Sequence, residues 1–541
     1  MRTRLPRLSA LVLVTAVAIG AYLRLDQIGS QVLIDDEWHA LHQVMHRLPS
    51  SMFLDFGFAD YSIPLGILYW YVAQWTGLSE LSMRMPMLVC GLVTLVALPL
   101  YVARRTSPSV AAVFALLLAV SPLLVIYSRM ARPYAVTFLL GWAAHAAYQR
   151  YARPGGAHVG AGAAYASAAT LAAWMHPIVA PFVVAPLLWG LARMRGESQA
   201  ARTRAFLRLL ALGLATGIAM CAVLLPPLVA NAHSMTAKSG IDHPNIRTFV
   251  GVWYAWLGTP STAVVIACLL LALAGSRDVW RALPEARTGL LGVGLVLLAL
   301  LVTRPMFIYN PISCARYLLP FVALLLLSIA AGGVRVGVWA TRRLRSPQEA
   351  AMAIALIPAV ALAAQTPLRP MLSRPNSETL HFLYHFDFRP GRNPYPPYMA
   401  GIPLSRFWQD LASRPAQSVR IAAAPFYFES YDWDAPRWER ISRQRVIPGF
   451  LTGLCVDERP GETPDTPAFR LRNAVHLADA DEIARNRIDL VVWQKPYTRV
   501  TQGRPSVVGA DTAHCEAVLR ARFGAPVYED AVLAAFKPGQ K

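Results

Sequence analysis

Long apolar runs constrain this chain more than any other feature of its sequence. A helix needs about 20 predominantly apolar residues to cross the core of a bilayer, and windows of this kind occur roughly eleven times before residue 366. Only 15% of all residues are charged, whereas soluble domains carry about a quarter. The sequence therefore predicts a polytopic α-helical membrane protein. The expected spans are Leu8–Leu25, Pro86–Tyr101, Val110–Ile126, Tyr134–Tyr148, Gly160–Met175, Ile178–Leu191, Phe206–Leu228, Ser261–Leu273, Thr288–Val302, Tyr317–Val334 and Ala350–Ala364.

Basic residues gather in every second loop between these windows. The clusters lie at Arg2–Arg7, Arg104-Arg105, Arg150–Arg153, Arg193–Arg208, Arg277–Arg287 and Arg335–Arg345. The positive-inside rule assigns them to the cytoplasm and the other loops to the periplasm or exterior of a bacterial plasma membrane. The first window has no clear small-x-small cleavage site after it and is expected to stay as an anchor. Binding of the basic clusters to anionic lipid headgroups accounts for the net charge of +20. The sequence contains no recognisable nucleic-acid-binding motif, so no nucleic-acid partner is expected.

The composition changes after about residue 365. We expect a membrane module over residues 1–365, with a first external loop at about residues 26–85, and an external soluble α/β domain over residues 366–541. Cys455 and Cys515 both lie in this tail, where a disulfide is permitted, and their pairing is a hypothesis. The expected strands are Val419–Pro425 and Ile488–Trp493, and the expected helices are Asp479–Arg487 and Thr512–Phe523.

The first external loop opens with the acidic and histidine-rich stretch "LIDDEWHALHQVMH", Leu33–His46. Acidic side chains at the start of a helix are favoured by its dipole, so a solvated helix start is one interpretation. The other is a metal site, because carboxylates and imidazoles are common metal ligands and the histidines share one helix face. The residues concerned are Asp35, Asp36, Glu37, His39, His42 and His46.

Three other loops on the same side contain arginine, tyrosine and histidine. Interfacial snorkelling and aromatic-belt tyrosines explain any one of these residues. Because so many of these residues lie on the same side of the membrane as the acidic loop, a shared site is favoured. They are Tyr127, Arg129, Arg132 and Tyr134 in "YSRMARPYA", His176 in "WMHP", whose windows could also form one broken or re-entrant element, and Arg304, Tyr309, Arg316 and Tyr317 in "TRPMFIYNPISCARY".

Taken in order, several segments resemble the GT-C superfamily of polytopic glycosyltransferases. The similarity is to the bacterial branch related to protein O-mannosyltransferases and the lipid A aminoarabinose transferase, and it covers about residues 8–335. The segments are the external acidic pair, "SELSMRMPMLVCGLVTLVALPLYVARR" (Ser79–Arg105), "YSRMARPYA", "WMHP" and "ARYLLPFVALLLLSIAAG" (Ala315–Gly332). The tail resembles the external domains of such enzymes more loosely.

The resemblance implies an inverting glycosyltransferase that moves a sugar from a polyprenyl-phosphate-linked donor to a lipid, glycan or protein acceptor of the envelope. The acidic pair matches Asp36, expected as the catalytic base, and Glu37, expected to position the acceptor or a metal; Asp35 substitutes if the register differs by one residue. A divalent metal is a possible cofactor, with Asp36, Glu37 and His39 as possible ligands. The residues expected at the donor phosphate are Arg129, Arg132, Arg316 and Tyr317, and the other site candidates are Tyr127, Tyr134, His176, Arg304 and Tyr309.

One segment departs from the pattern of the family. Many relatives have a His-Pro-Pro-Leu-like stretch after the acidic loop, where this chain has "DYSIPLGILYWY", Asp60–Tyr71, without a histidine. Asp55 or Asp60 is then an alternative second carboxylate, and a degenerate enzyme stays open. A transporter or flippase of lipid-linked sugars and an inactive envelope scaffold are the alternative functions. The sugar and the acceptor are left open, because acceptor pockets are built from variable loops.

Overall fold

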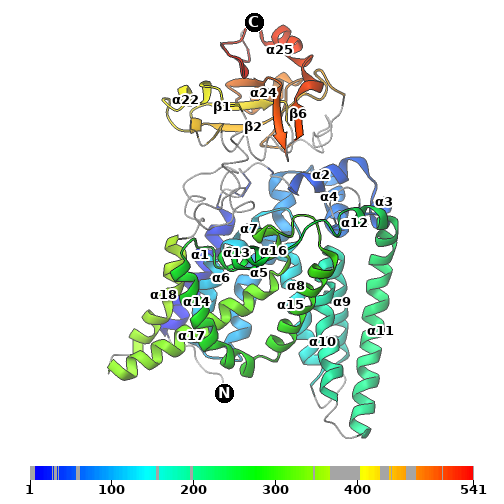
Figure 1. Cartoon of the computed structure of the whole chain (residues 1–541), viewed down its shortest axis with the longest axis vertical. Helices are drawn as coiled ribbons and strands as arrows, with labels where there is room; N and C mark the ends of the chain where they lie inside the picture. Colours follow the sequence, from blue (N-terminus) through cyan, green and yellow to red (C-terminus); the bar gives the residue numbers. More distant parts are fainter. Residues whose placement is uncertain are drawn as a thin grey trace.

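The computed structural model describes residues 7–26, 28–29, 33, 36–56, 61–153, 158–194, 199–344, 348–365, 403–426, 438–439, 441–457, 471–501 and 504–539. Within these ranges a large array of helices is followed by a smaller region that contains a β-sheet (Figure 1). The sheet region stands at one end of the helical part (Figure 1).

Six helices among the described residues are long enough and apolar enough to cross a membrane. They are α1 (Arg7–Leu25), α5 (Glu80–Ala103), α11 (Gln199–Ala230), α14 (Thr262–Ala282), α15 (Pro284–Thr303) and α17 (Pro320–Leu344). A seventh span results if α6 (Pro108–Val120) and α7 (Pro122–Arg129), which meet at a bend of 58°, are counted as one.

The other expected windows also coincide with helices, but these are shorter or less apolar. They are α8 (Tyr134–Tyr151), α9 (Val159–Met175), α10 (Ala180–Arg193) and α18 (Gln348–Gln365). Every window predicted from the sequence therefore lies on helix, whereas a total of eleven crossings is not confirmed. Helix α8 illustrates why some predicted windows are less apolar than a membrane span requires. It buries polar side chains such as His145 against neighbouring helices and is therefore less apolar than a lipid-facing helix.

Helices α9 and α10 form an antiparallel pair. The Tyr165 hydroxyl of α9 donates to the Val183 carbonyl of α10 at 2.7 Å, so the chain reverses direction between them. The reversal occurs at His176-Pro177 and includes the 3₁₀ helix η1 (Pro177–Val179).

Local signals in the sequence explain where several of these helices begin and how closely they pack. Ser79 and Ser82 form a capping box at the start of α5. Pro122 occupies the first turn of α7, where a missing N–H costs nothing. A Cβ at Gly91 of α5 would lie 2.1 Å from the Ser128 hydroxyl, so only glycine lets α7 cross α5 this closely.

Short helices connect the spans at the end that faces the sheet region. The first loop forms α2 (Asp36–His46), α3 (Pro49–Leu54) and α4 (Ile63–Thr76). The sequence windows did not include α4, which has 14 residues. The other connecting helices are α12 (Ala232–Ala237), α13 (Ile246–Leu257) and α16 (Pro311–Tyr317).

The tail contains a six-stranded mixed sheet with the order β3-β2-β1-β4-β8-β7. Strands β3, β2, β1 and β4 run parallel, whereas β8 pairs antiparallel with both β4 and β7. The strands are β1 (Arg420–Ala424), β2 (Arg445–Phe450), β3 (Val475–His476), β4 (Leu490–Gln494), β7 (Tyr528–Glu529) and β8 (Leu533–Phe536), and a separate hairpin joins β5 (Tyr497–Thr501) to β6 (Arg504–Val508).

The predictions for the tail agree well with its structure. Both expected strands are present as β1 and β4, and every residue of β4 is buried, as its continuous apolar run indicates. The expected helices are present as α24 (Ala480–Arg485), capped by Asp479, and as η4 (Ala510–Thr512) followed by α25 (Cys515–Phe523); α22 (Phe407–Leu411) is a further short helix. The hypothesised disulfide is confirmed: Cys455 and Cys515 are bonded, with 5.5 Å between their Cα atoms.

Candidate active site

A completely buried ion pair joins the first loop to α5. The Glu37 carboxylate of α2 receives two hydrogen bonds from the Arg84 guanidinium, at 2.9 Å from Nε and 2.8 Å from Nη2. Both side chains have a relative exposure of 0%. Arg84 also donates to the Ile28 carbonyl at 2.7 Å, and Glu37 accepts the Ala131 N–H at 2.8 Å. Glu37 thus connects the acidic loop both to α5 and to "YSRMARPYA".

The "YSRMARPYA" segment is itself buried over its whole length. Arg129 ends α7 and donates from Nη1 to the Leu23 carbonyl of α1 at 2.8 Å. Arg24 of α1 donates from Nη1 to the Gly20 carbonyl at 2.9 Å and from Nε to the Ser128 hydroxyl at 3.3 Å. These two arginines therefore fasten the end of α1 to α7.

Aromatic and arginine side chains from four separate segments meet next to this buried segment. Ring centroids are 4.7 Å apart for Tyr127 and Tyr134, and 5.7 Å apart for Tyr134 and His176. The Arg316 guanidinium lies over the rings of Tyr134 and Tyr317, at 5.7 and 5.2 Å from their centroids, a geometry that favours cation–π attraction. We call Tyr61, Tyr127, Tyr134, His176, Arg316 and Tyr317 the arginine–aromatic cluster.

His176 is at the centre of this cluster. Its ring lies 6.1 Å from that of Tyr61 and 5.8 Å from that of Tyr317. Its Nδ1 accepts the Ile178 N–H at 3.4 Å, which places the proton of a neutral imidazole on Nε2. The side chain is 8% exposed. His176 therefore presents a donor nitrogen within a largely buried aromatic surround.

The short helices α13 and α16 position Arg316. Trp256 of α13 donates from its indole N–H to the Ala315 carbonyl at 3.1 Å, and Asn310 caps α16 by accepting the Ile312 N–H. Helices α7, α13 and α16 lie near one another beneath α2 (Figure 1). Arg316, although distant in sequence, therefore shares one end of the bundle with Arg129 and Arg132, and Arg132 is 5% exposed.

The sheet region packs directly on the first loop. The Trp38 ring of α2 lies 4.8 Å from that of Phe426 and 5.9 Å from that of Phe450. The backbone N–H of Asn473 donates to the buried Glu80 carboxylate at the start of α5, at 2.7 Å. The tail therefore covers the loop that contains the acidic pair.

Several solved structures are similar to this chain over most of its length. One is ArnT from Cupriavidus metallidurans, with 13% identity, a TM-score of 0.42 and 97% of both chains covered; it has also been solved bound to undecaprenyl phosphate. A second is the arabinofuranosyltransferase AftD from Mycobacteria, with 16% identity, a TM-score of 0.45, and 99% of this chain and 40% of AftD covered. A third is the Archaeoglobus fulgidus oligosaccharyltransferase, with 13% identity, a TM-score of 0.38, and 89% and 68% covered. No family model matches the sequence, and no curated protein is significantly similar to it.

Arg304 and Tyr309 lie outside the arginine–aromatic cluster, in a contact of their own. Arg304 ends α15 and approaches the His243 ring, with Nη1 2.9 Å from Nε2. Tyr309 is 50% exposed, and its carbonyl accepts the Thr248 hydroxyl at 2.8 Å. Partial burial and the Asp242 carboxylate raise the pKa of the Tyr309 phenol. Both residues belong to a separate contact between the loops around residues 240 and 305.

The structure describes only some of the acidic and histidine side chains that were predicted to belong to the site. Asp36 is the first residue of α2, but its side chain and those of His42 and His46 lie outside the described part of the structure, as do Asp35 and Asp60. His39 is half-buried. Asp55 binds Asn231 at 2.7 Å and lies 3.3 Å from Arg47, at the junction of the first loop with α11. Among the described residues, no three His, Cys, Asp or Glu side chains are grouped as a metal ion would require.

Sequence reasoning missed two residues of the site. Arg84 lies two residues before the expected span Pro86–Tyr101, and no local pattern in the sequence pairs it with Glu37. Tyr61 belongs to the stretch that lacks the histidine expected from the family, and the structure brings its ring to His176. The neighbouring Ser62 hydroxyl approaches the Met175 sulfur at 3.5 Å, so this stretch is fixed against the end of α9.

Proposed function

We propose that the chain is an inverting glycosyltransferase that transfers a sugar from a polyprenyl-phosphate-linked donor to an acceptor at the external face of a membrane. One observation carries the proposal. Segments that resemble the GT-C superfamily and are far apart in sequence bring Tyr134, His176, Arg316 and Tyr317 into one buried cluster. Glu37 connects the adjoining "YSRMARPYA" segment to the acidic loop.

The chemistry of the donor explains why arginines belong at such a site. A phosphate leaves without a proton from a general acid, but its developing negative charge needs positive charge nearby. Arg316 and Arg132 are assigned to this task, with Tyr317 and His176 beside them as hydrogen-bond donors. Arg129 is assigned to orienting the loop, because its Nη1 is engaged by the end of α1.

The acidic pair is assigned two different roles. Asp36 is the catalytic base: its carboxylate takes the proton of the acceptor hydroxyl as that oxygen attacks the anomeric carbon from the face opposite the phosphate. The bond from the anomeric carbon to the phosphate oxygen breaks, and its electron pair stays on the phosphate. Glu37 is a positioning residue, because its carboxylate is committed to Arg84 and the Ala131 N–H. No step requires a metal ion.

The test is a transfer assay with purified full-length protein in liposomes. Radiolabelled polyprenyl-phosphate hexoses and pentoses are offered with total envelope acceptors to wild type, to Asp36→Asn and to Asp410→Asn, an exposed aspartate of the tail that serves as the matched control. Transfer by wild type and the control, with loss in Asp36→Asn, supports the proposal.

Two other outcomes would contradict the proposal. If wild type binds the donors but transfers no label with any sugar, also after divalent metal is added, a scaffold is favoured. If donor label instead crosses the bilayer of the liposome, a transporter of lipid-linked sugars is favoured. Equal transfer by wild type and Asp36→Asn would leave the enzyme class but remove Asp36 as the base.

A further inference from the structure

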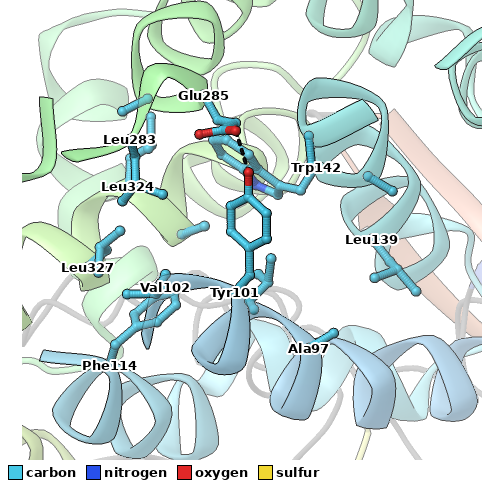
Figure 2. Close-up of a pocket in the computed structure, with 15 residues that line it drawn as sticks. Ala97, Tyr101, Val102, Phe114, Leu139, Trp142, Leu283, Glu285, Leu324 and Leu327 are labelled. Atoms are coloured by element: carbon cyan, nitrogen blue, oxygen red, sulfur yellow. Dashed lines mark hydrogen bonds between the residues drawn. The ribbon is translucent and has the colours of Figure 1, made fainter. Parts of the chain in front are cut away.

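A cavity of about 190 Å³ lies between α5, α8, α15 and α17 (Figure 2). Its walls are almost entirely apolar, and it is larger than the apolar cavity of about 150 Å³ that accepts benzene in an engineered protein. Ala97 and Ala143 line it and are exposed on the surface of their helices, so the cavity reaches the outside of the bundle there. In a bilayer, that surface faces lipid.

One end of the cavity is polar. The Tyr101 hydroxyl donates to Oε1 of Glu285 and accepts a hydrogen bond from Arg105 at 2.8 Å (Figure 2). Nη1 of Arg105 lies 3.6 Å from the same carboxylate oxygen. The negative charge of Glu285 is thus already compensated, and the charge network is confined to Oε1.

Two polar atoms at this end have no hydrogen-bond partner among the described residues. They are Oε2 of Glu285, an acceptor, and the indole N–H of Trp142, a donor. Their side chains belong to residues that are 3% and 7% exposed. Buried polar groups in proteins are almost always hydrogen-bonded. An acceptor and a donor in one apolar cavity therefore indicate a ligand.

The two side chains lie at the same end of the cavity. Trp142 packs against α15 at Gly289, where an added Cβ would lie 2.5 Å from the indole ring. Gly289 is one helical turn from Glu285 and shares its face. Figure 2 shows Tyr101, Trp142 and Glu285 converging at the same end of the cavity.

The cavity is far from the proposed active site. Arg84 and Tyr101 are both on α5, and the 17 residues between their positions correspond to a rise of about 25 Å. Tyr101 lies next to Arg104-Arg105, one of the arginine-rich clusters, whereas Arg84 pairs with the first loop. The cavity therefore opens at the opposite end of the bundle.

We propose that this cavity binds the hydroxyl end of a neutral lipid alcohol. A single hydroxyl satisfies both atoms, because it donates to Oε2 of Glu285 and accepts from the Trp142 N–H. A phosphate monoester has only acceptors at neutral pH and would be repelled by the carboxylate. An ammonium group cannot accept from the indole. The first carbons of the alkyl chain fill the apolar space, and the rest of the chain leaves past Ala97 and Ala143 into the bilayer.

The test uses the full-length protein in phosphatidylcholine nanodiscs. A hexadecanol that contains a diazirine is photocrosslinked, and the labelled peptides are identified by mass spectrometry. Labelling is expected in the α5 and α8 peptides that line the cavity. Unlabelled hexadecanol is expected to compete, whereas hexadecyl methyl ether, which cannot donate, and hexadecyl phosphate are expected to compete several-fold less.

Three variants connect the labelling to the cavity. Ala143→Leu narrows the mouth, and Trp142→Phe removes the N–H but keeps an aromatic ring; both are expected to lower labelling several-fold. Ala211→Leu, on the exposed face of α11, is the matched control and is expected to change nothing. The wild-type competition series does not depend on the folding of any variant. Equal competition by alcohol, ether and phosphate, or full labelling of Ala143→Leu, would identify ordinary surrounding lipid and overturn the proposal.

Discussion

Glu37 and Arg84 form a two-bond ion pair that is completely shielded from solvent, between the first loop and the fifth helix. Taking two charges out of water is costly, and leaving one of them alone costs about 3–5 kcal/mol. We therefore expect Glu37→Gln, which leaves the Arg84 charge buried, to lower the free energy of unfolding by about that amount. Denaturant unfolding of the purified protein in detergent measures the change.

The matched control replaces both partners. Glu37→Leu combined with Arg84→Met removes the charges together, and most of the stability is expected to return, because apolar pairs of similar volume often substitute for buried ion pairs. Transfer activity is expected to stay low in the double variant, because the Ala131 N–H loses its acceptor and the loop is no longer held. A Glu37→Gln variant as stable as wild type would show that the pair contributes little.

Arg316 provides a test of the donor-phosphate assignment. Removing a preorganised donor from a transition-state charge typically lowers kcat by about 10²–10³, and Arg316→Ala is expected to lose transfer on that scale. Arg316→Lys keeps the charge but not the planar stacking on Tyr134 and Tyr317, so partial activity is expected. Steady-state kinetics with a labelled donor separates kcat from KM.

An arginine elsewhere on the same part of the chain serves as the control for Arg316. Arg335 lies in the second half of α17, its side chain 58% exposed and 3.8 Å from Asp278. Exposed pairs of this kind contribute little, so Arg335→Ala is expected to transfer sugar like wild type. If Arg316→Ala changes KM for the acceptor alone, the assignment to the donor phosphate is wrong.

Much of the helical architecture was predictable because each span needs its own apolar run. Each of the eleven predicted windows coincides with helix, and the apolar run Ile488–Trp493 predicted the buried strand β4. The ordered "YSRMARPYA", "WMHP" and "ARYLLP" segments also predicted residues that meet, because consecutive antiparallel helices return alternate loops to the same side.

What the sequence could not predict depends on contacts between distant residues. Arg84 lies 47 residues from Glu37, and no local pattern pairs them. Arg304 and Tyr309 have the same residue types as Arg316 and Tyr317, yet they lie in a different contact, because Arg316 and Tyr317 end helix α16 whereas Arg304 and Tyr309 precede it. The number of crossings was not predictable for a related reason: buried helices such as α8 exchange apolar residues for polar contacts.

The contact between the tail and the first loop is expected to control the acidic helix. Phe426 packs on Trp38, and their ring centroids are 4.8 Å apart. Trp38 lies two residues after Asp36 in α2. Phe426→Leu keeps an apolar side chain but removes the ring contact, and we expect faster hydrogen exchange across α2 together with lower transfer activity. Hydrogen–deuterium exchange with mass spectrometry on the reconstituted protein measures the first effect.

Phe523→Leu is the control for this contact. Phe523 is 7% exposed and packs in the tail against Phe536, away from the first loop. The substitution weakens the tail to a similar degree and is expected to leave exchange in α2 unchanged. Equal exchange in both variants would mean that tail stability, and not the Trp38 contact, governs the loop.

The disulfide between Cys455 and Cys515 is expected to stabilise the tail by restricting its unfolded state. The cysteines are 60 residues apart in sequence, and closing a loop of that length contributes about 4 kcal/mol in the chain-entropy description. Reduction is therefore expected to increase exchange in β1 and β4, while the helical part changes little. The same comparison in Cys455→Ser/Cys515→Ser should show no effect of reductant, because the four other cysteines are free thiols. Alkylation of the denatured protein without reductant should accordingly modify four cysteines and leave two protected. Modification of all six without reductant would show that the bond is absent and that the sheet is held by its buried strands alone.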